Sequence, residues 1–308
     1  MSSIVPTHQA RPYKHASDIP DDVLRMLSDN EAAANVILPF AKKALNSPRG
    51  GDNEQLWIAL YDDTNNVEFV LSCTNGPLGN YPIFIVASKS PAQIAQEEAH
   101  GMNLTDSLLP LVLCLLEEVP PQRVFSVFSI ARVAEKFAEI FEAHTREEYG
   151  IQALKDPYYN ATFTFCNSET FDEFRAFPLR GSENIAIALC RADMSHLEGV
   201  KVLCKKFSET SVSTSLHRPI HELSMFWFRQ PPYILGDARA ELEARTMITN
   251  QQVWVHMVQK DDQDPEVACL VATTRESDNV TAVTKVYAAE HWRGRSCATR
   301  LLHRVCQE

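Results

Sequence analysis

Apolar and polar residues follow two different periods along the chain. Alternation at period two is typical of half-buried strands, and a period near 3.6 is typical of amphipathic helices. Helices are predicted at 19–46, 91–118 (broken near Gly101 and near Pro110), 132–145, 193–207, 237–249 and 297–306. Strands are predicted at 56–61, 67–73, 81–87, 124–129, 158–166, 185–189, 253–258, 267–274 and 283–287. Strands that alternate with helices predict an α/β fold with a mixed sheet.

The order of these segments divides the chain into parts. Residues 1–18 are polar and are predicted to be disordered, residues 19–170 form a first domain, and residues 183–308 form a second. Each domain has helices, a hairpin, a buried strand and a helix in that order, which favours an internal duplication although residue identities are not shared. Residues 208–232 interrupt the pattern with a Ser/Thr-rich stretch and the apolar run 225–228.

Composition narrows the classes of partner. The 308 residues carry a net charge of -11, with 45% hydrophobic and 22% charged residues, values that suit a globular domain with a core. This acidic balance argues against a nucleic-acid partner. The N-terminus has no apolar signal segment, and the longest apolar run, 108–116, contains Pro110 and is too short to cross a membrane. We therefore expect a cytoplasmic protein, or a nuclear one, without a membrane partner.

Eight cysteines are scattered along the chain without a CxxC pair, and most lie in apolar segments. Reduced, buried thiols are the expected state. The sequence has no metal-ligand spacing, no Ser/His/Asp arrangement and no Walker loop, so no metal is expected.

The segment 283–306 carries the most informative chemistry. An alternating strand, 283–287, is followed by a short basic turn, 292–298, which leads directly into an amphipathic helix. Free backbone N–H groups at a helix start, together with the helix dipole, favour a bound phosphate. Arg293 and Arg295 add positive charge in an otherwise acidic chain. The turn is therefore a candidate diphosphate site.

The turn and its surroundings resemble the GNAT superfamily of acyl-CoA N-acyltransferases. The signature of that family, Arg/Gln-x-x-Gly-x-Gly/Ala after its fourth strand, corresponds here to residues 293–298. Arg293 and Ala298 match, whereas Ser296 stands where the family has Gly. Residues 185–306 follow the family order of strand, helix, helix, hairpin, strand, basic turn and helix, while the N-terminal half resembles it in element order alone.

The resemblance implies an acyl-CoA-dependent N-acyltransferase that uses acetyl-CoA as co-substrate and acetylates an unidentified primary amine. Small amines, protein lysines and protein N-termini all remain open as acceptors. The coenzyme would lie on the strand end and the turn, at Val286, Tyr287, Arg293, Gly294, Arg295, Ser296, Cys297 and Ala298. Ser296 can donate its N–H, but a positive φ there would cost about 1 kcal/mol or more.

The resemblance implies direct attack of the neutral amine on the thioester, with a carboxylate or water as base. Glu276 and Glu290 are the candidate carboxylates, although exposed turn residues are the more ordinary interpretation of both. Cys297 could have a lowered thiol pKa at a helix N-terminus, but a packed, inert cysteine is favoured. A non-catalytic or fragmentary GNAT-like binding module, and an α/β protein that binds another phosphorylated ligand, are the alternative interpretations.

The second domain lacks part of the family pattern. The family continues after this helix with a fifth strand, a fourth helix and closing strands, which form the other wall of the slot for the pantetheine arm. A truncated chain and a degenerate relative both explain an end at Glu308. Residues 124–145 resemble that fifth strand and fourth helix, and they would complete the second domain if 124–129 lay beside 283–287.

Overall fold

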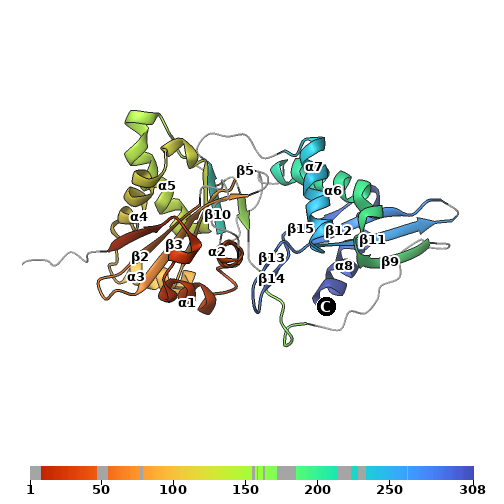
Figure 1. Ribbon diagram of the computed structural model, residues 1–308, viewed down its shortest axis with the longest axis horizontal. Helices are drawn as coiled ribbons and strands as arrows, with labels where there is room; N and C mark the ends of the chain where they lie inside the picture. The colour runs from red at the N-terminus through yellow and green to blue at the C-terminus, as the bar shows by residue number, and fades with distance from the viewer. Residues whose placement is uncertain are drawn as a thin grey trace, which may run out of the picture. The chain divides into compact units, whose positions relative to one another are not determined.

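The computed structural model describes residues 8–46, 55–76, 79–154, 157, 159–161, 164–171, 185–213, 223–227, 234–261 and 263–308. They form two compact units. The first comprises Met1–Phe163 and His217–Pro231, and the second comprises Thr164–Leu216 and Pro232–Glu308. Each unit has its own sheet and its own helices (Figure 1).

The first unit contains a seven-stranded mixed sheet with the order β1-β2-β3-β6-β7-β10-β8. Neighbouring strands are antiparallel except β6 and β7, which are parallel. A separate two-stranded ladder joins β4 (Asn75–Gly76) to β5 (Gly79–Asn80). The strands of the main sheet are β1 (Gln9–Tyr13), β2 (Leu56–Tyr61), β3 (Val67–Cys73), β6 (Ile83–Ala87), β7 (Ser126–Ile130), β8 (Tyr159–Ala161) and β10 (Leu223–Trp227).

Helices cover both faces of this sheet. Alternate residues of β2 serve opposite faces, as the strand period requires. Trp57 and Tyr61 pack with α1 (Asp21–Asp29) and α2 (Ile37–Leu45). Ile58 and Leu60 pack in the opposite layer, which contains α3 (Pro91–Ala99), α4 (Leu104–Glu118) and α5 (Ala131–Tyr149). Every residue of β2 is therefore buried.

The helix boundaries refine the sequence predictions. The predicted break near Gly101 is confirmed, because Gly101 has a φ of 98° between α3 and α4. The predicted break near Pro110 is wrong, since Pro110 lies inside α4. Leu108, Leu111 and Leu115 of this helix are fully buried, and their packing keeps the helix continuous despite the lost backbone N–H. No single helix among the described residues is long and apolar enough to span a membrane; α3 and α4 pass such a test together but are bent by 120°.

The N-terminal segment is more ordered than its composition predicts. β1 pairs with β2 over its whole length, from Gln9 opposite Tyr61 to Tyr13 opposite Trp57, and a 3₁₀ helix, η1 (Ala16–Asp18), follows. Backbone pairing with a sheet edge requires no apolar side chains, so a polar composition does not reveal it. Residues 1–7 lie outside the described part of the chain.

The second unit contains a four-stranded antiparallel sheet with the order β15-β12-β11-β9. Helices α6 (Leu197–Ser213) and α7 (Asp237–Thr249) pack on one face, and α8 (Cys297–Cys306) packs on the other. The predicted order of strand, two helices, hairpin, strand, turn and helix is confirmed. The remaining elements are β9 (Ile185–Arg191), η3 (Met194–His196), β11 (Val253–Lys260), β12 (Glu266–Ala272), β13 (Arg275–Glu276), β14 (Thr281–Ala282), β15 (Lys285–Ala288) and η5 (Glu290–Trp292).

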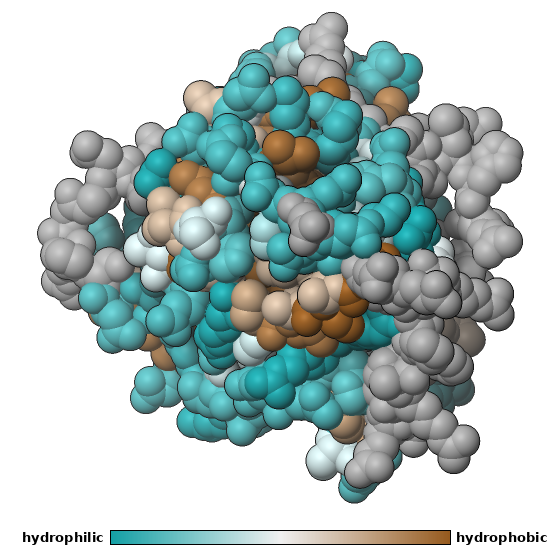
Figure 2. Space-filling model, turned by 90° about the vertical axis from the view of Figure 1, so that its right-hand side faces the viewer, coloured by the Kyte–Doolittle hydropathy of each residue, from teal (hydrophilic) through white to brown (hydrophobic). Residues whose placement is uncertain are grey.

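β9 forms the other edge of this sheet and is largely exposed. In Figure 2, which views the model from the right-hand side of Figure 1, an apolar patch interrupts the hydrophilic surface. Ile187 of β9 is 45% exposed. The alternating apolar run 185–189 predicts a buried side chain at this position. An edge strand has no neighbouring strand on one side, so its backbone N–H and C=O groups on that side have no strand to pair with.

Two strands lie elsewhere than the sequence predicts. β10 comes from residues 223–227, between α6 and α7 in the chain, yet it pairs with β7 and β8 in the sheet of the first unit. The sequence pattern instead predicts that this segment belongs to a continuous domain, 183–308. β7 has β6 on one side and β10 on the other, so the prediction that 124–129 lies beside 283–287 is wrong. Phe228 lies outside the described residues.

The hairpins of the two units share a detail of their register. In β2–β3 the ladder skips Glu68, and in β11–β12 it skips Ala268, so each hairpin has one extra residue in its second strand. The carbonyl of each extra residue accepts a hydrogen bond from the residue after the next main strand. Ser88 N–H donates to Glu68 at 2.8 Å, and Ala289 N–H donates to Ala268 at 2.9 Å. The turns that follow β6 and β15 are therefore structurally comparable.

Candidate functional site

The outer edge of β15 begins the candidate site. Ala289 directs its N–H towards β12, and alternate residues of an antiparallel strand point their backbone groups to opposite edges. Val286 and Ala288 therefore direct theirs away from β12. Within the described residues, no strand pairs with β15 on that side. The Nε–H of Arg293 donates to the carbonyl of Ala288 at 3.3 Å, which brings the basic turn against this edge.

The backbone of the turn adopts two left-handed conformations before α8 begins. Gly294 has a φ of 73°, and Ser296, the N-cap residue of α8, has a φ of 60° and a ψ of 22°. The N–H of Arg300 donates to the carbonyl of Ser296 at 3.0 Å, as the first full turn of the helix requires. In the described part of the chain, the N–H groups of residues 294–299 have no backbone or side-chain oxygen as acceptor. The donors predicted for residues 294–298 are thus available at this helix start.

The two arginine side chains of the turn are also available to bind an anion. Arg293 and Arg295 are exposed, and neither forms a salt bridge with any residue that the structure describes. Each guanidinium lies over an aromatic ring, Arg293 at 5.1 Å from the centroid of Tyr287 and Arg295 at 4.9 Å from that of Trp292. Stacking of this kind holds a guanidinium in place while its N–H groups remain in its own plane, where the groups other than the Nε–H of Arg293 can bind an anion.

Two residues that the sequence analysis missed hold the turn in position. Glu266, at the start of β12, accepts a hydrogen bond of 2.7 Å from Nε1–H of the buried Trp292, and His291 Nε2 lies 3.2 Å from the same carboxylate. Arg300 is buried in α8, and its Nη1 donates to the carbonyl of Arg295 at 3.2 Å. The sequence could have indicated Arg300, because it is a charged residue one helical turn after Cys297 on the otherwise apolar face of α8.

His256 lies on β11 in the layer that α8 covers. Its side chain is fully buried, and neither ring nitrogen has a hydrogen-bond partner among the described residues. Burial, with a smaller effect of the Arg300 guanidinium, lowers the pKa of His256 to about 4. The imidazole is therefore neutral at physiological pH. His256 is thus a buried histidine of the sheet core, and no catalytic role is assigned to it.

Cys297 is buried under the turn. Burial raises the pKa of its thiol, and the nearby guanidinium groups of Arg300 and Arg295 oppose that shift only in part. The possibility of a lowered thiol pKa at the helix start is therefore wrong, because desolvation of the thiolate outweighs the helix dipole and the arginines. Cys297 is the packed cysteine that the sequence analysis favoured.

The two candidate carboxylates lie on exposed turns. Glu276 is in the short β13 strand, opposite Thr281 of β14, and Glu290 begins η5 directly after β15. Within the described residues, neither carboxylate forms a hydrogen bond or an ion pair with the turn 293–298. Glu290 is near Lys206 of α6, whose pKa is raised chiefly by Glu209 and to a smaller extent by Glu290. Glu290 is thus the carboxylate that flanks the edge of β15.

A polar cluster lies on the face of β15 that α6 and α7 cover. Lys285 Nζ is 3.0 Å from Glu243 Oε1 of α7, and both side chains are mostly buried. The second oxygen of Glu243 and the hydroxyl of Tyr287 are buried without a hydrogen-bond partner in the described residues. Phe207 of α6 contacts both strand residues, with Lys285 Nζ 5.0 Å from its ring centroid and the Tyr287 ring at 6.4 Å. This cluster can accept a hydrogen bond from a polar group that reaches it.

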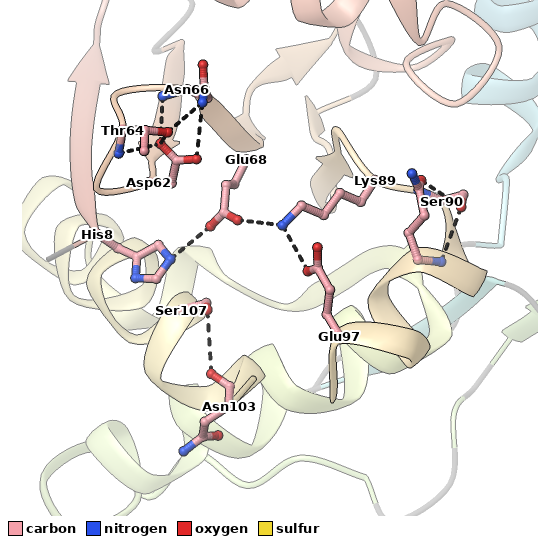
Figure 3. Close-up of polar contacts among 11 residues, drawn as sticks. His8, Asp62, Thr64, Asn66, Glu68, Lys89, Ser90, Glu97, Asn103 and Ser107 are labelled. Carbon is pink, nitrogen blue, oxygen red and sulfur yellow. Dashed lines mark hydrogen bonds and ion pairs between the residues drawn. The ribbon is translucent and has the colours of Figure 1, made fainter. Parts of the chain in front are cut away.

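The comparable turn of the first unit is closed by its own side chains. Lys89 Nζ lies 2.9 Å from Glu68 Oε1 and 2.8 Å from Glu97 Oε2, and His8 Nε2 lies 2.9 Å from Glu68 Oε2 (Figure 3). Two carboxylates therefore compensate the charge of this lysine. An anion placed here would be repelled by Glu68 and Glu97.

The backbone donors of that turn are also used. Ser90 N–H donates to Gln93 Oε1 at 2.8 Å, Gln93 N–H donates to Ser90 Oγ at 3.3 Å, and Pro91 has no N–H. On the adjacent strand pair, Ser129 Oγ donates to the carbonyl of Ile85 at 2.8 Å. The backbone donors at the start of α3 are therefore largely engaged within the turn itself.

The described residues contain no group of three or more His, Cys, Asp or Glu side chains that could hold a metal ion.

Comparison with known proteins gives little further information. No protein-family model matches the sequence, and no curated protein matches it significantly. Among solved structures, the chain is similar to a GCN5-related N-acetyltransferase from Sphaerobacter thermophilus, with 14% sequence identity and a TM-score of 0.44. The similarity covers 97% of this chain and 81% of the other. A TM-score of this size is too low to establish a shared fold.

Proposed function

We propose that the chain is an acyl-CoA-dependent N-acyltransferase, and specifically an N-acetyltransferase, that binds acetyl-CoA in its second unit. The observation that carries this proposal is the turn 293–298, where unpaired N–H groups at the start of α8 lie beside two exposed arginines and the outer edge of β15. A diphosphate needs this combination of donors and positive charge.

The residues present suit each part of the coenzyme. The N–H groups of residues 294–298 would bind the diphosphate oxygens, and Arg293 and Arg295 would neutralise their charge. The outward backbone groups of Val286 and the N–H of Ala288 would pair with the amides of the pantetheine arm, as an added strand pairs with a sheet edge. The guanidinium of Arg293 lies over the ring of Tyr287, which holds it beside β15.

The acetyl thioester supplies an activated carbonyl for attack by an amine. The nitrogen of a neutral amine would form the new C–N bond while the C–S bond breaks, and the amine proton would pass to a carboxylate or water as the coenzyme thiolate leaves. Glu290 is the proposed base because it follows β15 directly. Glu243, whose second oxygen has no partner among the described residues, is the proposed group that orients the acceptor.

We further propose that the chain contains two GNAT-like units in tandem, the first of which does not bind coenzyme. The matching extra residues Glu68 and Ala268, with the same hydrogen bond from the following strand end, support a duplication. The ion pairs of Lys89 and the capping box at Ser90 support a structural role for the first unit.

A second candidate function is binding without catalysis. It is favoured by the position of Glu276 and Glu290, whose carboxylates are exposed and, within the described residues, form no hydrogen bond with the turn 293–298. In that case the second unit would be a coenzyme-responsive binding module and not an enzyme.

Calorimetry on the full chain tests the proposal. Acetyl-CoA should bind, and the variant Arg293→Ala/Arg295→Ala should bind at least tenfold more weakly. Lys89→Ala is the matched control, since it removes a basic residue from the comparable turn of the first unit, and it should leave affinity unchanged. The absence of binding, or equal affinity of the double variant and the parent, contradicts the proposal. Release of free thiol from acetyl-CoA across a panel of amines then distinguishes an enzyme from a binding module.

A further inference from the structure

Two exposed cysteines from distant parts of the sequence meet in the second unit. Cys166 and Cys306 are both exposed, and the Cys166 thiol lies close enough to Cys306 to help raise the pKa of the Cys306 thiol. A second contact supports the same placement, because the rings of Phe171 and His303 lie with their centroids 4.8 Å apart. The segment 164–171 therefore runs along the last turn of α8.

The other cysteines are much less accessible. Cys73, Cys204, Cys269 and Cys297 are buried, and Cys114 and Cys190 are partly buried. Because oxidation of a thiol requires access from solvent, a pair of cysteines that is both exposed and adjacent can react with a reagent in solvent and then with each other. Burial against its neighbours, together with the adjacent Cys166 thiol, raises the pKa of Cys306. Cys306 therefore keeps its proton at neutral pH.

We propose that Cys166 and Cys306 are a redox modification site that forms a reversible intramolecular disulfide when the chain meets a peroxide. The Cys166 sulfur attacks one peroxide oxygen and the O–O bond breaks, which gives a sulfenic acid at Cys166 and releases water. The Cys306 sulfur then attacks the Cys166 sulfur, the S–S bond forms, and the hydroxyl leaves with the thiol proton as a second water. Two thiols lose two electrons in total, and hydrogen peroxide accepts them.

The disulfide would fix the C-terminal end of α8 to the segment 164–171. α8 begins at the turn 293–298, and in its last turn Arg304 and Cys306 are exposed. A covalent link at this end restricts fraying of the helix, so amide hydrogen exchange over residues 303–306 should slow on oxidation. This inference does not depend on the proposed acetyltransferase activity.

The test uses the full native chain, a small excess of hydrogen peroxide and a peptide map without reductant. The oxidised chain should lose the mass of two hydrogen atoms, the peptides that contain Cys166 and Cys306 should be joined, and dithiothreitol should reverse both changes. Cys166→Ser and Cys306→Ser should each abolish the link, and Cys114→Ser should retain it. Links between other cysteines, a link that forms only after unfolding in urea, or an unchanged mass loss in Cys166→Ser would overturn the proposal.

Discussion

The carboxylate of Glu266 accepts a hydrogen bond of 2.7 Å from the indole Nε1–H of Trp292. This bond joins the first residue of β12 to the last residue of η5, directly before the basic turn. Trp292 is buried, whereas the Glu266 side chain is about half exposed. The approach to the turn is therefore fixed by one carboxylate on the preceding hairpin.

Replacement of Glu266 by Ala leaves the buried indole N–H without its acceptor. We expect Glu266→Ala to lower the free energy of unfolding by about 1–2 kcal/mol, the cost of one unsatisfied donor. Glu266→Gln retains an acceptor oxygen and should lose less than half as much. Urea denaturation of both variants measures the difference, and equal losses would show that the hydrogen bond does not anchor Trp292.

The left-handed conformation of Ser296 should be measurable as strain. An L-residue in this region costs about 1–2 kcal/mol, and the greater freedom of Gly in the unfolded chain offsets about half of it. We expect Ser296→Gly to raise the free energy of unfolding by about 0.5 kcal/mol. Gly294→Ala is the matched opposite change, because its φ of 73° is equally unfavourable and no atom lies within 4 Å of the added Cβ. It should destabilise the chain by about 1 kcal/mol, and a Gly294→Ala variant as stable as the parent would contradict this account.

Stability should fall in mild acid because of His256. Its pKa is lowered from 6.5 to about 4 in the folded chain, so below the unfolded value the unfolded state binds a proton that the folded state does not. The stability contributed by the neutral imidazole is therefore complete above pH 6.5 and declines towards pH 4, by about 2 kcal/mol at pH 5. Urea denaturation across this range measures it, and His256→Leu, which removes the titrating group, should show a smaller decline. An equal decline in the variant would assign the effect to other residues.

Acetyl-CoA should bind once per chain and not twice. The first unit has ion pairs at Lys89 and a capping box at Ser90 where the second unit has unpaired N–H groups and exposed arginines. Calorimetry should therefore give a stoichiometry near one, with binding that weakens as salt concentration rises because the contacts are ionic. A stoichiometry of two would mean that the first unit opens its turn when the ligand arrives.

The local pattern of the chain predicted most of the second unit. Alternation at 253–258 and 267–274 and the helical spacing at 297–306 depend on neighbouring residues, and the structure confirms β11, β12 and α8 at these places. The basic turn before α8 is likewise a local feature, which is why it could be identified before any tertiary contact was known. Ser296 was singled out differently, because the resembled family signature has Gly at its position, and the structure gives Ser296 a φ of 60°.

The local pattern of the sequence could not predict which strands pair when they are distant in the chain. β10 pairs with β7 and β8 although its residues lie between α6 and α7, because strand pairing depends on which edge is available and not on sequence distance. The polar strand β1 was missed for a related reason, since its stability comes from backbone hydrogen bonds with β2.

By itself, the sequence determined the mixed α/β character, the element order of the second unit and the position of a basic turn at a helix start. The tertiary structure alone decided which side chains surround that turn. Glu266 and Arg300 anchor it, burial keeps the pKa of Cys297 high, and carboxylates close the comparable turn at Lys89. The reason is physical: periodicity records which residues avoid water, whereas charge compensation and desolvation depend on neighbours that only folding brings together.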